Sequence, residues 1–124
     1  MNEPMTTLIV TNRAAFWESF LAVFESHDSR MVMAGSVEES LMSLRTHKAA
    51  LVVFDLGMDA SALRHAVFQV LTINAMIHTA AVSALSADEF HDAMEGLGML
   101  ASLPPQPSSQ DVNRLMDDLA ALSF

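Results

Sequence analysis

A short, unbroken apolar run constrains this chain more than any other stretch of its sequence. Residues 49–54 read Ala-Ala-Leu-Val-Val-Phe and lead directly into Asp55, with Gly57 two positions later. A valine-rich run of this length, ended by an acidic residue and a glycine, is typical of a central parallel strand covered on both faces. Parallel sheets present ligand-handling residues at the carboxyl ends of their strands, so Asp55 is the first candidate for chemistry. The alternative is that Asp55 only begins a turn or caps the next helix.

Apolar runs alternate with helical repeats along the whole chain. Strands are predicted at residues 6–10, 30–34, 49–55, 75–82 and 99–103. Helices are predicted at residues 16–24, 36–47, 61–71, 86–96 and 111–122. Two of these helices begin with a capping box, in which Ser36 and Ser86 are each followed three residues later by Glu. Regular alternation with short connections predicts a parallel sheet with helices on both sides.

The expected fold class is therefore α/β, a three-layer flavodoxin-like (βα)5 domain that spans residues 1–124. In its compact form this plan has the strand order 2-1-3-4-5, and its crevice lies outside the first and third strands. That order would bring Thr11 and Asn12, at the end of the first strand, beside Asp55.

Composition excludes several classes of function. With 124 residues, 52% of them hydrophobic, the chain can bury one proper core. It has no cysteine, which excludes disulfides, a thiolate nucleophile and cysteine-bound metals. The net charge of −9, with basic residues scattered singly, argues against a nucleic-acid surface. No apolar run is long enough to cross a bilayer, and the amino terminus lacks the basic start of a secretory signal. We expect a cytoplasmic protein with protein partners.

Three strand ends resemble the receiver domains of two-component response regulators. Residues 51–56, Leu-Val-Val-Phe-Asp-Leu, resemble the run into the phosphoacceptor of that family, which would be Asp55. Residues 82–84, Val-Ser-Ala, are similar to the hydroxyl site at the end of the fourth strand, and residues 96–104 follow the glycine-rich approach to a Lys-Pro pair. The resemblance covers essentially the whole chain and implies a bacterial phosphorelay signalling domain rather than an enzyme.

The departures from the family pattern fall on its charged groups. Thr11 and Asn12 stand where the family has an acidic pair, and Leu103 stands where it has the lysine. Mg²⁺ usually takes one or two carboxylates, and it supplies much of the charge neutralisation in phosphoryl transfer. If Mg²⁺ binds at all, Asn12, Asp55 and the Gly57 carbonyl would be its ligands. We therefore expect no cofactor, and a vestigial active site made of Thr11, Asn12, Ser83 and Leu103 around Asp55.

Two nearby residues have more than one interpretation. Arg13 could reach the crevice and compensate for the missing lysine, but an arginine in a loop is expected to point to solvent. The Ser83 hydroxyl could bond to Asp55 or could cap local backbone, and the sequence does not decide between them. The resemblance also implies a cis peptide bond between Leu103 and Pro104, which X-Pro bonds permit.

These features lead to three hypotheses. The first is a pseudo-receiver that signals through protein contacts without Mg²⁺-dependent phosphorylation. The alternative is a working receiver that a histidine kinase phosphorylates at Asp55. The third is a small enzyme or cofactor carrier on the same fold, since this architecture hosts many functions.

Protein partners are expected under the first two hypotheses, either a histidine kinase or a downstream regulator. No output domain is expected after the last helix. A homodimer is predicted through the fourth helix, the fifth strand and the last helix. That face carries Phe90, Met94, Met99, Met116 and Phe124, and some of these side chains are expected to remain exposed.

Overall fold

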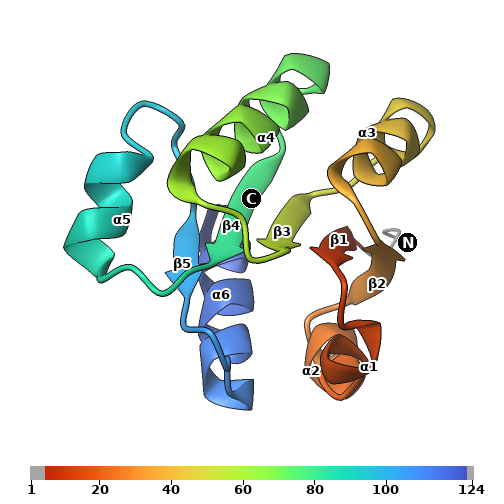
Figure 1. Ribbon diagram of the computed structural model, residues 1–124. Helices are drawn as coiled ribbons and strands as arrows, with labels where there is room; N and C mark the ends of the chain where they lie inside the picture. The colour runs from red at the N-terminus through yellow and green to blue at the C-terminus, as the bar shows by residue number, and fades with distance from the viewer. Residues whose placement is uncertain (1–4, 123–124) are drawn as a thin grey trace.

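The computed structural model describes residues 5–122, which form a five-stranded parallel sheet with helices on both faces (Figure 1). The strands are β1 (Met5–Thr11), β2 (Ser29–Ala34), β3 (Leu51–Asp55), β4 (His78–Val82) and β5 (Ala101–Leu103). The helices are α1 (Ala14–Glu18), α2 (Leu21–Ser26), α3 (Val37–Thr46), α4 (Ala60–Ile73), α5 (Ala87–Ala93) and α6 (Ser109–Leu122). The strand order is β2-β1-β3-β4-β5, which confirms the predicted fold class and order. Within the described chain, no helix combines the length and apolar character needed to cross a membrane.

The sheet separates two hydrophobic cores. Along β3, Val52 and Phe54 face the core covered by α3, α4 and α5, whereas Leu51 and Val53 face the core covered by α1, α2 and α6. Figure 1 shows α3 and α4 on one side of the sheet and α1, α2 and α6 on the other. Every residue of β3 is buried, as its continuous apolar run predicts for a strand with helices on both faces.

Strand register brings the carboxyl ends of β1 and β3 together. Thr11, the last residue of β1, is the register partner of Asp55, the last residue of β3. Val82 at the end of β4 is paired with Leu103 at the end of β5. All four strand ends therefore meet at one edge of the sheet, where the candidate site lies.

The predicted first helix is broken into α1 and α2, which corrects the single helix expected at residues 16–24. The Ser19 and Phe20 backbone N–H groups donate to the carbonyls of Phe16 and Trp17, three residues back, at 3.3 and 2.9 Å. The rings of Phe16, Trp17 and Phe20 meet edge to face, with centroids 5.3–5.8 Å apart. The Ser19 hydroxyl also donates to the Phe16 carbonyl, which competes with regular helical bonding. Aromatic spacing predicts the buried face correctly but carries no signal for this tighter turn.

The capping pattern also differs from the expectation. Ser86 and Glu89 form the predicted reciprocal box. Ser36 accepts from the Glu39 N–H, but the Glu39 carboxylate accepts from Gly35 instead of Ser36, so the first box is only half formed.

A third, unpredicted box starts α6, two residues earlier than expected. The Ser108 N–H and hydroxyl donate to Asp111 Oδ2 at 2.8 and 3.0 Å, and the Asp111 N–H donates back to the Ser108 hydroxyl.

The apolar side chains expected at an exposed face mostly lie inside. Phe90, Met94 and Met116 are buried, and Met99 is half-buried, because they pack against the sheet. Phe124 lies outside the described residues. Of the four that the structure describes, only Met99 is therefore partly exposed, so these side chains form no large apolar patch.

We predict that Asp111→Asn weakens the α6 cap in a pH-dependent way. The two Ser108 donors, the backbone N–H first, hold the pKa of Asp111 below its ordinary value of 3.8. A lowered folded-state pKa adds stability above pH 3.8, and this contribution is lost as the pH falls through the folded pKa. Urea unfolding should show a loss of about 0.5 kcal/mol at pH 7 that shrinks toward pH 3. The matched control is Asp118→Asn, nearer the carboxyl end of the same helix, and an equal loss in that variant would contradict the cap assignment.

Candidate functional site

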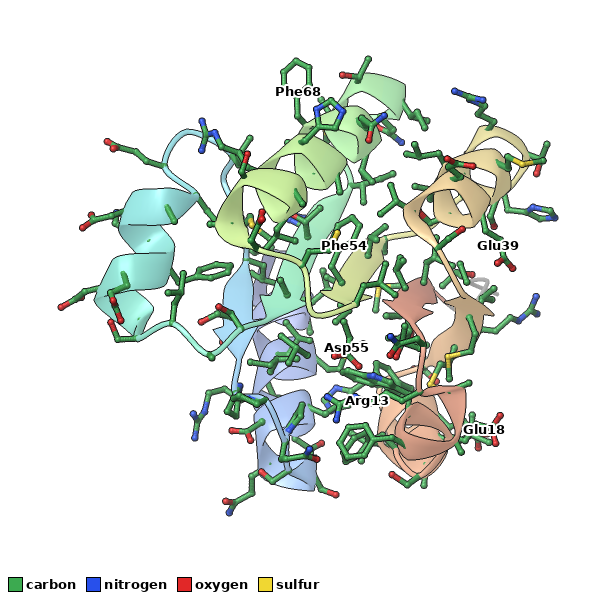
Figure 2. All side chains as sticks on the ribbon, viewed as in Figure 1. Arg13, Glu18, Glu39, Phe54, Asp55 and Phe68 are labelled. Atoms are coloured by element: carbon green, nitrogen blue, oxygen red, sulfur yellow. The ribbon has the colours of Figure 1, made fainter. Side chains whose placement is uncertain are left out.

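Asp55 is held at the end of β3 with little access to solvent. Its exposed fraction is 7%, and its neighbour across the sheet is Thr11. Figure 2 shows Asp55 and Arg13 next to one another beneath the ends of β1 and β3. A buried carboxylate must be hydrogen-bonded and charge-compensated to be stable, so the partners of Asp55 define the site.

Four hydrogen bonds converge on the Asp55 carboxylate. Oδ2 accepts from Thr11 Oγ1 at 3.0 Å, from Arg13 Nε at 2.7 Å and from Trp17 Nε1 at 2.7 Å. Oδ1 accepts from Arg13 Nη2 at 3.2 Å. All of the donors belong to one short segment, the end of β1 and the start of α1. This segment satisfies the carboxylate without any group from β4 or β5.

Arg13 does not point to solvent, which corrects the expectation from its loop position. Its side chain is 28% exposed and forms a two-pronged ion pair with Asp55. Nη2 also donates to the Pro105 carbonyl at 2.8 Å, and the guanidinium carbon lies 4.2 Å from the centre of the Phe16 ring. The physical reason is the buried carboxylate, which has a single nearby cation available to neutralise it. Arg13 thereby connects the β1 end, the β3 end and the loop after β5.

Thr11 has a defined structural role beside this ion pair. The Arg13 backbone N–H donates to Thr11 Oγ1 at 3.0 Å, so the hydroxyl proton is left to donate to Asp55. The Thr11 hydroxyl thus accepts a hydrogen bond from the Arg13 backbone and donates one to the carboxylate. Through the first of these bonds it holds the backbone of Arg13 in place.

Trp17 is the site residue that sequence reasoning missed. The helical stripe predicts it as core, and it is fully buried, yet its indole N–H also donates to Asp55. A buried indole N–H needs an acceptor, and Trp17 lies four residues after Arg13 on the same helical face. Taken together, these two facts were the sequence signal that could have identified Trp17 as a partner of Asp55.

The other predicted site residues lie near Asp55 without bonding to it. Asn12 is exposed, and within the described chain its side chain has no hydrogen bond to the carboxylate. Ser83 is half-buried, and its hydroxyl accepts from the Leu85 N–H at 3.1 Å, so it caps local backbone. Gly57, at φ +68°, lines the groove in front of Asp55.

Leu103 belongs to the core rather than to the crevice. It is 4% exposed and packs among the side chains beneath α6, while its carbonyl accepts from the Ser83 N–H at 2.9 Å. The described residues contain no cis peptide bond, so the Leu103–Pro104 bond is trans and the expectation of a cis bond is wrong. Trans is the lower-energy isomer for X-Pro bonds in general.

A groove of about 510 Å³ opens in front of the carboxylate. Arg13 and Asp55 form its charged end, and Ser83 lines one wall. The remaining walls are mostly apolar, with contributions from Met58, Leu63, Leu85, Phe90 and Met94. At the charged end of the groove the Asp55 carboxylate pairs with the Arg13 guanidinium, while a second carboxylate that lines the groove, Asp59, caps α4.

The residues around Asp55 do not fit a divalent cation. No group of three or more acidic, His or Cys side chains that could hold a metal exists in residues 5–122. Oδ2 already accepts three hydrogen bonds, and Asp59, the next carboxylate along the chain, caps α4 by accepting from the Ala62 N–H. Two unit charges about 4 Å apart at an effective dielectric of about 20 interact by about 4 kcal/mol, and a divalent ion doubles this value. The guanidinium would therefore oppose a metal ion at the carboxylate.

Comparison with known proteins gives the same architecture. No family model and no curated protein matches the chain. Among solved structures, it resembles a two-component response regulator from Clostridium difficile, with a TM-score of 0.78, 10% identity and coverage of 97% of this chain and 99% of that one. It also resembles a response regulator receiver protein from Pseudomonas putida, with a TM-score of 0.75, 19% identity and coverage of 94% and 98%.

A third similar structure has a metal in the corresponding fold. It is the receiver domain of a sensor histidine kinase from Pseudomonas aeruginosa, solved with a magnesium ion coordinated in its active-site cleft. Its TM-score is 0.71 and its identity 14%, with coverage of 95% of this chain and 98% of that one. The chain therefore has the fold of response-regulator receiver domains.

We predict that Arg13→Ala destabilises the domain by about 2–3 kcal/mol, because Asp55 loses its charge partner and two of its four hydrogen bonds. Urea unfolding would measure the loss, with Arg45→Ala on the exposed side of α3 as the control, expected within about 0.5 kcal/mol of wild type. Adding Asp55→Asn to Arg13→Ala should recover part of the loss, since an amide needs no counter-charge. Equal losses in the Arg13 and Arg45 variants would refute the role of the ion pair.

A second prediction concerns the indole. Trp17→Phe should cost about 3–5 kcal/mol, made of the lost packing and the lost bond to a charged acceptor. The same change in an Asp55→Ala background should cost about 1–2 kcal/mol less, because the bond is already gone. A double-mutant cycle of unfolding free energies measures this difference, and a coupling of zero would show that Trp17 acts through packing alone.

Proposed function

We propose that this chain is a receiver-fold signalling domain that acts in the cytoplasm through protein contacts and is not phosphorylated at Asp55. The observation that carries the proposal is the set of four hydrogen bonds that Arg13, Trp17 and Thr11 donate to the carboxylate, three of them to Oδ2. The domain would work in a two-component or phosphorelay setting, with a histidine kinase or a downstream regulator as its partner. It would need no metal and no other cofactor.

The chemistry of phosphoryl transfer supports this proposal. A carboxylate that attacks phosphorus needs a free, positioned oxygen and cations to neutralise the charge that develops on the phosphoryl group. Asp55 Oδ2 has three donors, and the nearest cation, Arg13, is committed to the carboxylate and to the Pro105 carbonyl. Leu103 offers no charge to grip a phosphoryl oxygen. Vestigial roles for Thr11, Asn12, Ser83 and Leu103 are part of the proposal.

The second candidate function is a working phosphoacceptor. One observation favours it: Asp55 Oδ1 accepts only one hydrogen bond, at 3.2 Å, and Ser83 lines the groove in front of it. In this candidate, Arg13 would have to leave Asp55 and neutralise the incoming phosphoryl group.

The face made by α5, β5 and α6 is proposed as the contact surface, either for a homodimer or for another protein partner. Both helices carry exposed carboxylates, among them Asp88, Asp92 and Asp118. Like charges brought together by two copies repel each other, so a partner with a basic surface suits this face better than a second copy.

The decisive experiment is incubation of the purified protein with acetyl phosphate and Mg²⁺, followed by intact mass measurement. We expect no gain of a phosphoryl group, and no fluorescence change with beryllofluoride. A receiver with its full acidic set and lysine serves as the positive control in the same reaction. A phosphoryl group on Asp55, absent from Asp55→Asn, would replace the proposed function with the second candidate.

A further inference from the structure

We propose that Arg13 is the built-in counter-cation of the Asp55 pocket, and that its charge is what keeps metal ions out. Removal of this charge would turn the pocket into a cation site. The inference rests on the proposed function, because it explains how the site can be stable without a metal. It adds a specific role for one residue: Arg13 determines which cation Asp55 accepts.

The contacts of Arg13 suit this role. Its fork binds both carboxylate oxygens, with Nε at 2.7 Å from Oδ2 and Nη2 at 3.2 Å from Oδ1. The Pro105 carbonyl and the face of the Phe16 ring hold the guanidinium from two further sides. A guanidinium stays charged at any physiological pH and matches a carboxylate in shape, so it makes a permanent cation at a fixed place. A hydrated ion that binds Oδ1 would have to displace the Nη2 contact and then lie beside the fixed positive charge.

The pocket that remains without the charge has the oxygen ligands that hard cations use. Asp55 is 7% exposed and would be left as a carboxylate with no counter-charge. Gly57 lies at the same end of the groove, and Thr11 already touches Asp55. Burial of an unpaired charge is costly, which gives the altered pocket a reason to take up a metal ion.

Trp17 supplies a direct and local readout. It is the only tryptophan in the chain, and its Nε1 lies 2.7 Å from Asp55 Oδ2. Tb³⁺ emission sensitised by this indole therefore reports an ion at Asp55, whereas ions at distant surface carboxylates are poorly sensitised. The experiment titrates Tb³⁺ into wild type, Arg13→Gln and the control Arg45→Gln, with excitation of tryptophan. Arg13→Gln retains a long polar side chain but removes the charge.

We expect saturable emission from Arg13→Gln at a Tb³⁺ concentration roughly tenfold or more below any response of wild type or Arg45→Gln. Millimolar Mg²⁺ should compete with the Tb³⁺ and raise the Tm of Arg13→Gln only. Adding Asp55→Asn to Arg13→Gln should abolish the emission, and Arg13→Lys should exclude the ion as wild type does. Circular dichroism checks that each variant is folded.

Two results would overturn the inference: equal emission from wild type and Arg13→Gln, or no emission from folded Arg13→Gln. The wild-type protein tests the inference even if Arg13→Gln fails to fold. If Mg²⁺ raises the Tm of the wild-type protein and Tb³⁺ bound to it gives sensitised emission, the inference is overturned. Failure of the proposed function looks different, since it consists of a phosphoryl group on Asp55 in the wild-type protein, which the mass measurement detects.

Discussion

The ion pair between Arg13 and Asp55 is the interaction on which the site depends. The sheet places the carboxylate where water cannot neutralise it, and a buried charge is tolerated only with a partner and with its hydrogen bonds satisfied. The register of β1 against β3 sets Thr11 opposite Asp55, so the loop that follows begins beside the carboxylate. Arg13 and Trp17 then reach it from the start of α1. Residues 11–17 therefore supply all four hydrogen bonds to Asp55 found in the described chain.

A count of charges connects the departures from the family pattern. The resemblance implies three carboxylates, one ammonium and one divalent ion around the acceptor, which sum to zero. In this chain Thr11, Asn12 and Leu103 stand at the positions of the two acidic residues and the lysine, and the Asp55 carboxylate pairs with the Arg13 guanidinium. The charges of this ion pair also sum to zero. A buried Asp55 carboxylate with neither a metal ion nor Arg13 beside it would carry an unbalanced charge.

The sequence predicts the course of the backbone well, but it does not predict where side chains in loops point. Continuous apolar runs and helical repeats report burial directly, which is why the sheet order and the position of Asp55 were predictable. The direction of the Arg13 side chain was not predictable. An arginine in a loop is expected to face solvent, and that expectation takes no account of Asp55, which lies 42 residues away in sequence but pairs with Arg13 in the fold. The same limit applies to Trp17: its periodicity reports a buried ring, while its N–H bond depends on the register of a distant strand.

The break between α1 and α2 belongs to the same set of constraints as the ion pair. Trp17 must face the end of β3 to reach Asp55, while Phe24 must pack fully beneath α6 and the sheet. The tighter turn at Ser19 and Phe20 falls between these two side chains. The main departure from the helical pattern predicted by the sequence thus falls next to the donors of the site.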